Sequence, residues 1–294
     1  MNGFKLNIKY KLGAFFPVLK KINRMRKTNN TSIIILNYHG VLNEHKAHFN
    51  EQIQWLCKNY EIIDTKTFQS FLNKEIKLNG KKVLITFDDG FKSSYEVTKL
   101  FLDPLNIKAT FFLPSNFVGD KNKNMWKNFV SQNIYKNKKK GAHASYFQEP
   151  MSDKEIKKLI DNGHLIGSHT LNHLDLNTIL DENELKYELL QSKVDLERNY
   201  NININSLAYP FGGINHISEI ALNKISKYYD FCYSNIRGDN YSQTSPFAIR
   251  RQDISPDIPL LYFGFIIEGG LNWYWYEHRK KLDKMVFKLN SIKI

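Results

Sequence analysis

Short runs of apolar and β-branched residues alternate with segments of helical periodicity along most of the chain. The apolar runs predict buried strands over residues 32–36, 83–87, 109–113, 165–166, 206–209 and 231–234. The helical periodicity predicts helices that include 68–72, 94–102, 182–200 and 218–228, and a further helix that opens at a capping box, 152–155, and ends near 162–163. This alternation indicates an α/β fold. Polar residues of chemical interest follow several strands, which favours a (β/α) barrel.

One stretch, residues 116–150, breaks the alternation. It is rich in Asn and Lys, with scattered aromatic residues, and has no regular period. Long structureless stretches are uncommon inside compact domains, so we expect an insertion above the barrel. The pattern divides the chain into an N-terminal segment (1–30), a large domain (31–270) and a C-terminal helix (271–294).

The N-terminal segment has the pattern of a basic amphipathic helix. Its apolar residues form one stripe at helical spacing: Phe4, Ile8, Leu12, Phe15, Leu19 and Ile22. Most of its Lys and Arg residues fall elsewhere, and Pro17 should kink the helix or end its first half. Two interpretations fit this pattern: a helix lying in a membrane interface and a helix packed on the barrel.

An aromatic run precedes the basic C-terminal helix. Residues 271–276 contain Trp273, Tyr274, Trp275 and Tyr276, a composition typical of an interfacial segment. Together with the N-terminal stripe, it predicts two membrane-contacting elements. No apolar stretch approaches the roughly 18 or more residues of a transmembrane helix.

The basic character belongs to the appendages and the insertion. Residues 1–30, 119–142 and 279–294 together carry a net charge of +19, which leaves about −6 of the overall +13 for the rest of the chain. Basic segments can meet anionic lipid, nucleic acid or an acidic glycan, and for 119–142 a simple solubility role fits equally well. Since no nucleic-acid recognition motif is present, we expect no nucleic-acid partner.

Composition is that of a globular protein large enough for one sizeable domain. The chain has 294 residues, of which 42% are apolar and 24% charged, so disorder is not expected. Its two cysteines, Cys57 and Cys232, form no metal or redox motif.

Two short segments about eighty residues apart carry the candidate chemistry. Asp88 and Asp89 follow the predicted strand 83–87, where barrel enzymes place catalytic groups. His169 and His173 are four residues apart, which lets both imidazoles point the same way from one helical turn and bind one ion with a carboxylate. Two His and one Asp leave a coordination position open for water.

These segments, with Ala208–Gly212 and Ile35–Val41, resemble the motifs of the polysaccharide deacetylase family, also called the NodB-homology or carbohydrate esterase family 4 domain. Ile35–Val41 is similar to the Tyr-His entry strand of one large branch of this family. The resemblance covers roughly residues 31–255. It implies that the domain 31–270 is a catalytic domain with the distorted, incomplete (β/α) barrel of the NodB type.

The resemblance implies a role for each residue of the two segments. Asp89, His169 and His173 would bind a divalent metal, and Asp88 would be the general base that takes a proton from the attacking water. Zinc is the metal that we expect, although cobalt, nickel or another transition metal suits the same ligands.

The segment Tyr209–Gly212 resembles a third motif of the family. By this match the Phe211 backbone N–H would donate to the oxyanion, and Tyr209 and Pro210 would contact substrate. Ala208 stands where the family usually has an arginine that supports the catalytic carboxylate. Arg250 or Arg251 could replace it from a neighbouring strand, and we place Arg250 in the substrate site.

The family's final motif, a Leu-x-His that carries the general acid, has no clear counterpart. His216 lies in a predicted loop and His278 on the basic helix. His39 follows a strand and belongs to the matched Tyr-His segment, so it is the candidate catalytic histidine. Proton donation, substrate binding and a core role all fit it.

The expected function is removal of N-acetyl groups from an amino-sugar glycan, by base-assisted attack of water bound to the metal. A cell-surface polysaccharide, peptidoglycan or a lipid-linked glycan precursor fits as substrate, and the two interfacial elements favour the lipid-linked class. The alternatives are an O-acetyl esterase and a catalytically weak, carbohydrate-binding protein of the same fold. We expect a cytoplasmic protein, peripheral on the inner face of an anionic membrane, with an exported cell-envelope protein as the alternative.

Overall fold

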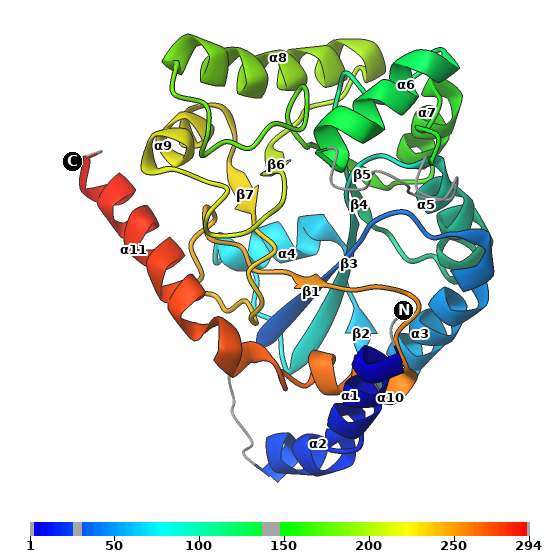
Figure 1. Cartoon of the computed structure of the whole chain (residues 1–294). Helices are drawn as coiled ribbons and strands as arrows, with labels where there is room; N and C mark the ends of the chain where they lie inside the picture. The colour runs from blue at the N-terminus through cyan, green and yellow to red at the C-terminus, as the bar shows by residue number, and fades with distance from the viewer. Residues whose placement is uncertain (1–2, 26–30, 137–147, 293–294) are drawn as a thin grey trace.

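A curled parallel sheet surrounded by helices forms the framework of the molecule (Figure 1). The computed structural model describes residues 3–25, 31–136 and 148–292. Part of the expected insertion, 137–147, lies outside the described residues, as does the side chain of Phe4.

The strands lie in the order β7–β6–β5–β4–β3–β1–β8, and every strand pair is parallel. They are β1 (Ser32–Tyr38), β3 (Lys81–Phe87), β4 (Thr110–Leu113), β5 (Leu165–Ser168), β6 (Ser206–Ala208), β7 (Phe231–Tyr233) and β8 (Gln252–Asp253). A short strand, β2 (Glu61–Ile62), pairs with the first half of β3, while β4 pairs with its last residues.

The two edges of the sheet are joined by the segment that leads into β8. Cys232 of β7 donates to the Pro246 carbonyl at 2.8 Å, and Ser234 donates to that of Ile249 at 2.8 Å. Three residues after Ile249, β8 begins and pairs with β1. A few hydrogen bonds therefore close the barrel where a regular barrel has a full ladder, which confirms the distorted, incomplete barrel.

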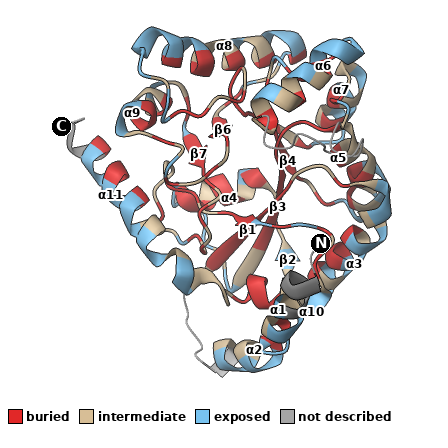
Figure 2. Ribbon diagram, in the orientation of Figure 1, coloured by how far each residue is buried: buried red, intermediate tan, exposed pale blue. Residues whose placement is uncertain are grey.

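Helices surround this sheet (Figures 1 and 2). They are α3 (Lys46–Asn59), α4 (Thr65–Leu72), α5 (Lys92–Val97), α6 (Lys123–Phe129), α7 (Asp153–Asp161), α8 (Glu182–Tyr200), α9 (Glu219–Tyr228), α10 (Leu260–Ile267) and α11 (Tyr276–Ile292). The predicted helix 94–102 is divided between α5 and a π-helical turn, η2 (Thr98–Leu102). Ser152 caps α7 through the predicted capping box with Glu155.

The interior of the barrel changes from apolar to polar along the strands. Side chains alternate between the two faces of a strand, so Ile33 and Ile35 belong to the inner core cluster and Ile34 and Leu36 to the outer one. Helix α4 packs Phe68 into the inner cluster. Beyond this apolar layer, the same inner faces carry polar side chains at the carboxyl ends of the strands.

Two helices precede the barrel, α1 (Gly3–Gly13) and α2 (Phe16–Met25), and two non-helical residues separate them. Pro17 is the second residue of α2, a position where its missing N–H costs little. Both helices pack on α10. Phe16 meets the ring of Trp55 edge-on at 5.7 Å, and Asn23 donates to the Glu268 carboxylate at 2.8 Å. The N-terminal segment is thus attached to the barrel.

The aromatic run before α11 is exposed. Trp273 and Tyr274, in the 3-10 turn η6 (Asn272–Trp275), have 76% and 64% of their surface accessible. Among the residues that the structure describes, we find no helix with the length and apolarity needed to cross a bilayer.

The contact between α2 and the barrel should depend on pH through Glu268. Burial disfavours the charge on this carboxylate, but Lys81, with donors from Tyr60 and Asn23, outweighs burial and lowers its pKa. A lowered pKa stabilises the fold above pH ~4.5, and this stability is lost as the pH falls through the folded-state pKa. We expect Glu268→Gln to lower the free energy of unfolding by about 1–3 kcal/mol at neutral pH. In urea titrations the difference from the unsubstituted chain should shrink below pH ~4; a difference that stays constant with pH would contradict this account.

Candidate active site

Asp88 and Asp89 lie in a tight turn at the carboxyl end of β3. Asp88 continues the strand, since its N–H donates to the Tyr38 carbonyl at 2.9 Å. Asp89 and Gly90 both have φ of +73°. A Cβ on Gly90 would lie 2.5 Å from Val118, so only glycine fits there. The turn leaves both residues buried: 1% of the surface of Asp88 and 4% of that of Asp89 is exposed.

His169 and His173 follow β5 in a loop, and the expected helical turn is wrong. Thr170 and His173 have φ of +66° and +56°, values that a right-handed helix cannot contain. Short polar contacts hold the loop: Thr170 donates its N–H to the Ser168 hydroxyl, and His173 donates to that of Thr170, both at 3.1 Å. The loop still brings the two rings together, with centroids 4.8 Å apart.

Backbone carbonyls fix the tautomer of each imidazole. His169 Nδ1 lies 2.6 Å from the Ala208 carbonyl, and His173 Nδ1 lies 3.2 Å from that of Asn133. A carbonyl oxygen only accepts, so both Nδ1 atoms carry the proton. Each Nε2 of the neutral ring is then left with its lone pair, and both point at Asp89.

The three side chains form a donor set that fits a divalent cation. The Asp89 Oδ1 atom lies 3.5 Å from His169 Nε2 and 3.4 Å from His173 Nε2. Within the described residues this trio is the group of His, Cys, Asp or Glu side chains arranged to hold a metal ion, with ligand atoms within 4.8 Å of one another. Two imidazole nitrogens and one carboxylate oxygen suit zinc and neighbouring transition metals. The structure therefore brings together the three predicted ligands.

Asp88 is held apart from this trio by a buried arginine. Arg251 is fully buried, and its Nη1 and Nη2 atoms donate to the two carboxylate oxygens of Asp88 at 2.7 Å each. Asn37 adds a third donor at 2.8 Å. Burial raises the pKa of Asp88, but the adjacent guanidinium outweighs it and brings this pKa below the ordinary value. Asp88 is thus an ionised carboxylate, with Oδ2 4.0 Å from His169 Nε2.

The expected place of Arg250 needs correction. Its guanidinium donates to both Asp283 oxygens at 2.8 and 3.0 Å, on the side of α11, and makes none of the contacts of the site. Arg251 is the neighbour that faces inward. It places a positive charge beside Asp88, the contact expected from an arginine at the position of Ala208.

Phe211 forms one wall of the site. Its ring meets that of His173 at 4.8 Å and that of His216 at 5.1 Å, and Lys136 Nζ lies 4.2 Å from the ring centre. Its backbone has φ of +61°, strained for a residue with a side chain. In the described parts of the chain the Phe211 N–H has no hydrogen-bond partner, so it can donate to a substrate oxygen.

Tyr209 and Pro210 do not line a substrate surface. Tyr209 is 1% exposed and belongs to the outer core cluster, and Pro210 is also buried. Their predicted contact with substrate is therefore corrected: both support the turn that presents Phe211.

His39 lies at the rim, as expected from its position after β1. Its Nδ1 atom is 3.5 Å from Asp253 Oδ1, and 39% of its side chain is exposed. Burial lowers the pKa of this imidazole, but the carboxylates of Asp89 and Asp253 outweigh it, so the pKa lies above its ordinary value. Asp253 was not among the predicted residues; it comes from β8, which is too short to be recognised by pattern.

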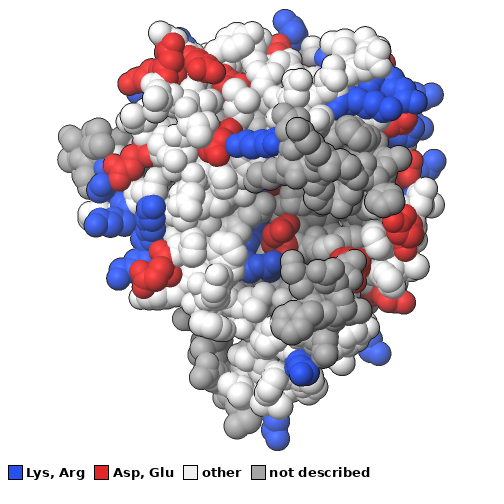
Figure 3. Space-filling model, in the orientation of Figure 1, with Lys and Arg blue, Asp and Glu red and all other residues white. Residues whose placement is uncertain are grey.

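The expected insertion contributes to the site. Asn133, in the π-helical turn η4 (Val130–Ile134), supplies the carbonyl that orients His173, and Lys136 covers Phe211. His216 pairs with Asp175 at 2.6 Å beside them. Figure 3 shows acidic and basic side chains meeting in a hollow near the middle of the face in view. Asn133, Lys136 and Asp175 were not among the predicted site residues, because irregular segments carry no period that places their side chains.

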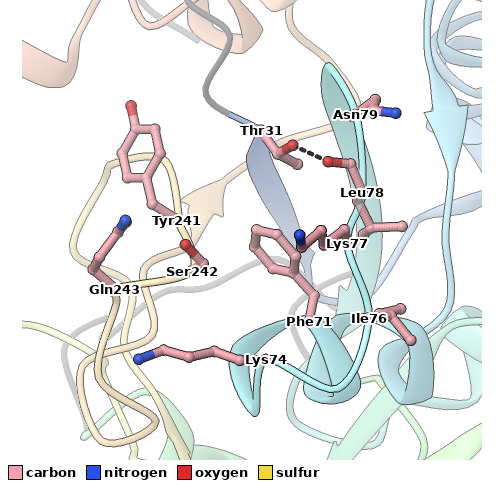
Figure 4. A pocket seen from close by; sticks show the side chains of 10 residues that line it. All are labelled: Thr31, Phe71, Lys74, Ile76, Lys77, Leu78, Asn79, Tyr241, Ser242 and Gln243. Atoms are coloured by element: carbon pink, nitrogen blue, oxygen red, sulfur yellow. Dashed lines mark hydrogen bonds between the residues drawn. The ribbon is translucent and has the colours of Figure 1, made fainter.

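A separate cavity of about 460 Å³ lies at the other end of the barrel, beside the starts of β1 and β3 (Figure 4). Its lining includes Thr31, Phe71 and Tyr241, and a hydrogen bond joins Thr31 to the Leu78 carbonyl. It contains none of the predicted site residues.

The sequence model of one family, described as polysaccharide deacetylase, matches residues 75–228, which is more than half of the chain. This chain belongs to the polysaccharide deacetylase family. The matched region contains both carboxylates, both histidines and Phe211, the residues that the geometry brings together.

Two bacterial relatives resemble this deacetylase over most of its length. It is 24% identical over 269 residues to YxkH of Bacillus subtilis, described as a candidate polysaccharide deacetylase, and the match covers 86% of each chain. It is 26% identical over 239 residues to the poly-β-1,6-N-acetyl-D-glucosamine N-deacetylase of Staphylococcus epidermidis, covering 71% of this chain and 75% of the relative.

Solved structures share the fold of this deacetylase. IcaB from Ammonifex degensii superposes with a TM-score of 0.64 at 19% identity, covering 81% of this chain and 97% of the other. The Streptococcus pyogenes deacetylase PplD, solved with acetate, superposes with a TM-score of 0.61 at 20% identity, covering 80% and 97%.

The donor set predicts how metal binding responds to substitution. Asp89→Asn removes the negative charge of one ligand and His173→Ala removes a ligand nitrogen, so we expect metal affinity to fall by at least about 100-fold. Asp88→Asn is the matched control, because both carboxylate oxygens of Asp88 accept hydrogen bonds from Arg251. The metal affinity of this variant should stay within about threefold of that of the unsubstituted deacetylase. Titration of metal-free protein with zinc measures these values, with elemental analysis as a check. Equal loss in the Asp88 variant would contradict the assignment.

Proposed function

We propose that the chain is a metal-dependent N-deacetylase that hydrolyses the acetamide of N-acetylglucosamine units in a glycan. The observation that carries this proposal is the pairing of two adjacent carboxylates with different partners. Asp89 faces two imidazole nitrogens, while Asp88 lies beside them, ionised and free of the ligand set. This division supplies both a cation site and a base.

Asp89, His169 and His173 would hold the cation. When bound there, a divalent metal supplies Lewis acidity, which acidifies water and polarises the acyl carbonyl. No other part of the proposal depends on which metal is present.

The chain's own residues supply the remaining steps. The carboxylate of Asp88 accepts the proton of the water that attacks the acetyl carbon. The Phe211 N–H donates to the oxygen of the resulting tetrahedral carbon. His39, with Asp253 Oδ1 3.5 Å from its Nδ1 atom, donates a proton to the departing sugar amine. These roles account for the C–N cleavage and for acetate as the second product.

The buried Arg251 supports catalysis over carbohydrate binding alone. Ala208 in the usual arginine position favoured a weakly active protein, but Arg251 makes the contact from another strand. The name of the Staphylococcus epidermidis relative supports poly-β-1,6-N-acetylglucosamine as the first substrate to test.

Acetate release tests this proposal directly. Purified protein should release acetate from β-1,6-linked N-acetylglucosamine oligomers, lose the activity with a chelator and regain it with added zinc. Asp88→Asn should lower kcat by about 10²-fold or more while retaining zinc. β-1,4-linked oligomers and O-acetylated glycans serve as comparison substrates. Absence of release from every N-acetylated glycan by zinc-loaded protein would overturn the proposal.

The acid role of His39 makes a separate prediction. His39→Gln should lower kcat on N-acetylated oligomers by about 10²–10⁴-fold, because the amine leaves poorly without a proton. Hydrolysis of 4-nitrophenyl acetate should be nearly unaffected, since nitrophenolate needs no proton to depart. If both substrates slow equally, His39 acts by binding or by orienting other groups.

A further inference from the structure

Helices α1 and α2 pack on the barrel through one face, and the predicted apolar stripe lies on a different face. At Gly13 an added Cβ would lie 2.9 Å from the Tyr262 backbone nitrogen, so the helix approaches α10 closely. Phe16, 9% exposed, packs on Trp55, and Asn23 bonds to Glu268. The residues that make these contacts, Gly13, Phe16 and Asn23, do not belong to the apolar stripe that the sequence predicts.

Part of the stripe is exposed to solvent, while Leu12 and Leu19 are half-buried. Its members Ile8, Phe15 and Ile22 have exposed fractions of 43%, 61% and 39%. Neighbouring apolar residues enlarge the surface: Val18, one turn before Ile22, at 57% and, on α10 beside Gly13, Leu261 at 52%. Single exposed apolar residues need no explanation, but a group aligned on two successive helices marks an interaction surface.

Positive charge surrounds this surface. Residues 1–30 contain eight Lys or Arg and no Asp or Glu. Lys11 is exposed one turn before Phe15, and Lys21 is exposed between Val18 and Ile22. In Figure 3, the atoms not drawn in grey at the lower end of the molecule, where Figure 1 places α1 and α2, are white or blue. The partner of this surface is therefore apolar in part and anionic in part.

We propose that the stripe of α1 and α2, with Leu261, docks on the surface of an anionic lipid bilayer. Apolar side chains on one helical face enter the boundary between headgroups and acyl chains, and the flanking lysines meet lipid phosphates. The helices lie at the edge of the molecule in Figure 1, where a flat surface can reach them. The two interpretations of the N-terminal pattern, packing on the barrel and docking on a membrane, are therefore compatible, because the two contacts use different faces of the helices.

Docking is independent of the proposed chemistry. None of the stripe residues whose side chains the structure describes contacts the site, so their substitution should leave acetate release from a soluble oligomer unchanged. A loss of docking with retained activity and a loss of activity with retained docking are then distinguishable.

Vesicle flotation with the full chain tests the proposal. The chain should float with vesicles of phosphatidylcholine and phosphatidylglycerol, more weakly with phosphatidylcholine alone, and less at high salt. The double variant Phe15→Ser/Ile22→Ser should lower the partition coefficient by about tenfold or more. Phe287→Ser on α11 is the matched control, since Phe287 is 72% exposed at another surface, and it should float normally. Unchanged thermal unfolding of each variant excludes a folding defect.

The charge component has its own pair of variants. Lys11→Glu/Lys21→Glu should lower partitioning onto anionic vesicles by about tenfold or more. Lys154→Glu/Lys157→Glu on α7 changes the net charge equally at another exposed site and should have little effect. Normal flotation of the Phe15/Ile22 variant would overturn the proposal. A full chain that does not float would also overturn it. If, in addition, the mass measured by light scattering falls from dimer to monomer in the Phe15→Ser/Ile22→Ser variant, the stripe contacts a second copy of the chain.

Discussion

The buried ion pair between Arg251 and Asp88 is the interaction on which the site depends. It lies at the carboxyl end of the barrel interior, where the apolar layer ends and Asn37 and Thr86 begin a polar one. A buried pair of charges is stable only when its remaining donors and acceptors are satisfied. Here the Arg251 Nε atom donates to the Ser234 carbonyl at 2.9 Å, and Asn37 donates to Asp88. The pair thereby connects β1, β3 and β7 to the segment that closes the barrel.

This pair also explains how two adjacent carboxylates take different roles. The guanidinium fork occupies both oxygens of Asp88, so Asp88 keeps its charge and stays out of the ligand set. Asp89 would point away from the barrel in an extended strand. Its left-handed backbone, followed by a glycine that has no room for a side chain, turns it towards His169 and His173. The strain of the turn is compensated by the contacts that surround it.

The framework follows from local pattern in the sequence, whereas the trio of Asp89, His169 and His173 was predicted from the resemblance to the family's motifs. Strand periodicity would also have distinguished Arg251 from Arg250: Ile249 faces the inner cluster, so the residue two positions later shares that face. The prediction of a helical turn for the two histidines was wrong because Thr170 and His173 adopt positive φ. Residues 169–173 contain no glycine that would have indicated such a conformation. Asn133 and Asp253 reach the site from an irregular segment and a two-residue strand, and neither carries a period that sequence can reveal.

The acidic limb of the pH profile tests this account most directly. Arg251→Lys keeps a positive charge but removes the fork, so the pKa of Asp88 should rise towards its ordinary value. Since only the ionised carboxylate accepts a proton, the acidic limb of kcat/KM for acetate release should move to higher pH, with zinc content little changed. An acidic limb at the same pH in both proteins would contradict the assignment of Asp88 as the base that Arg251 keeps charged.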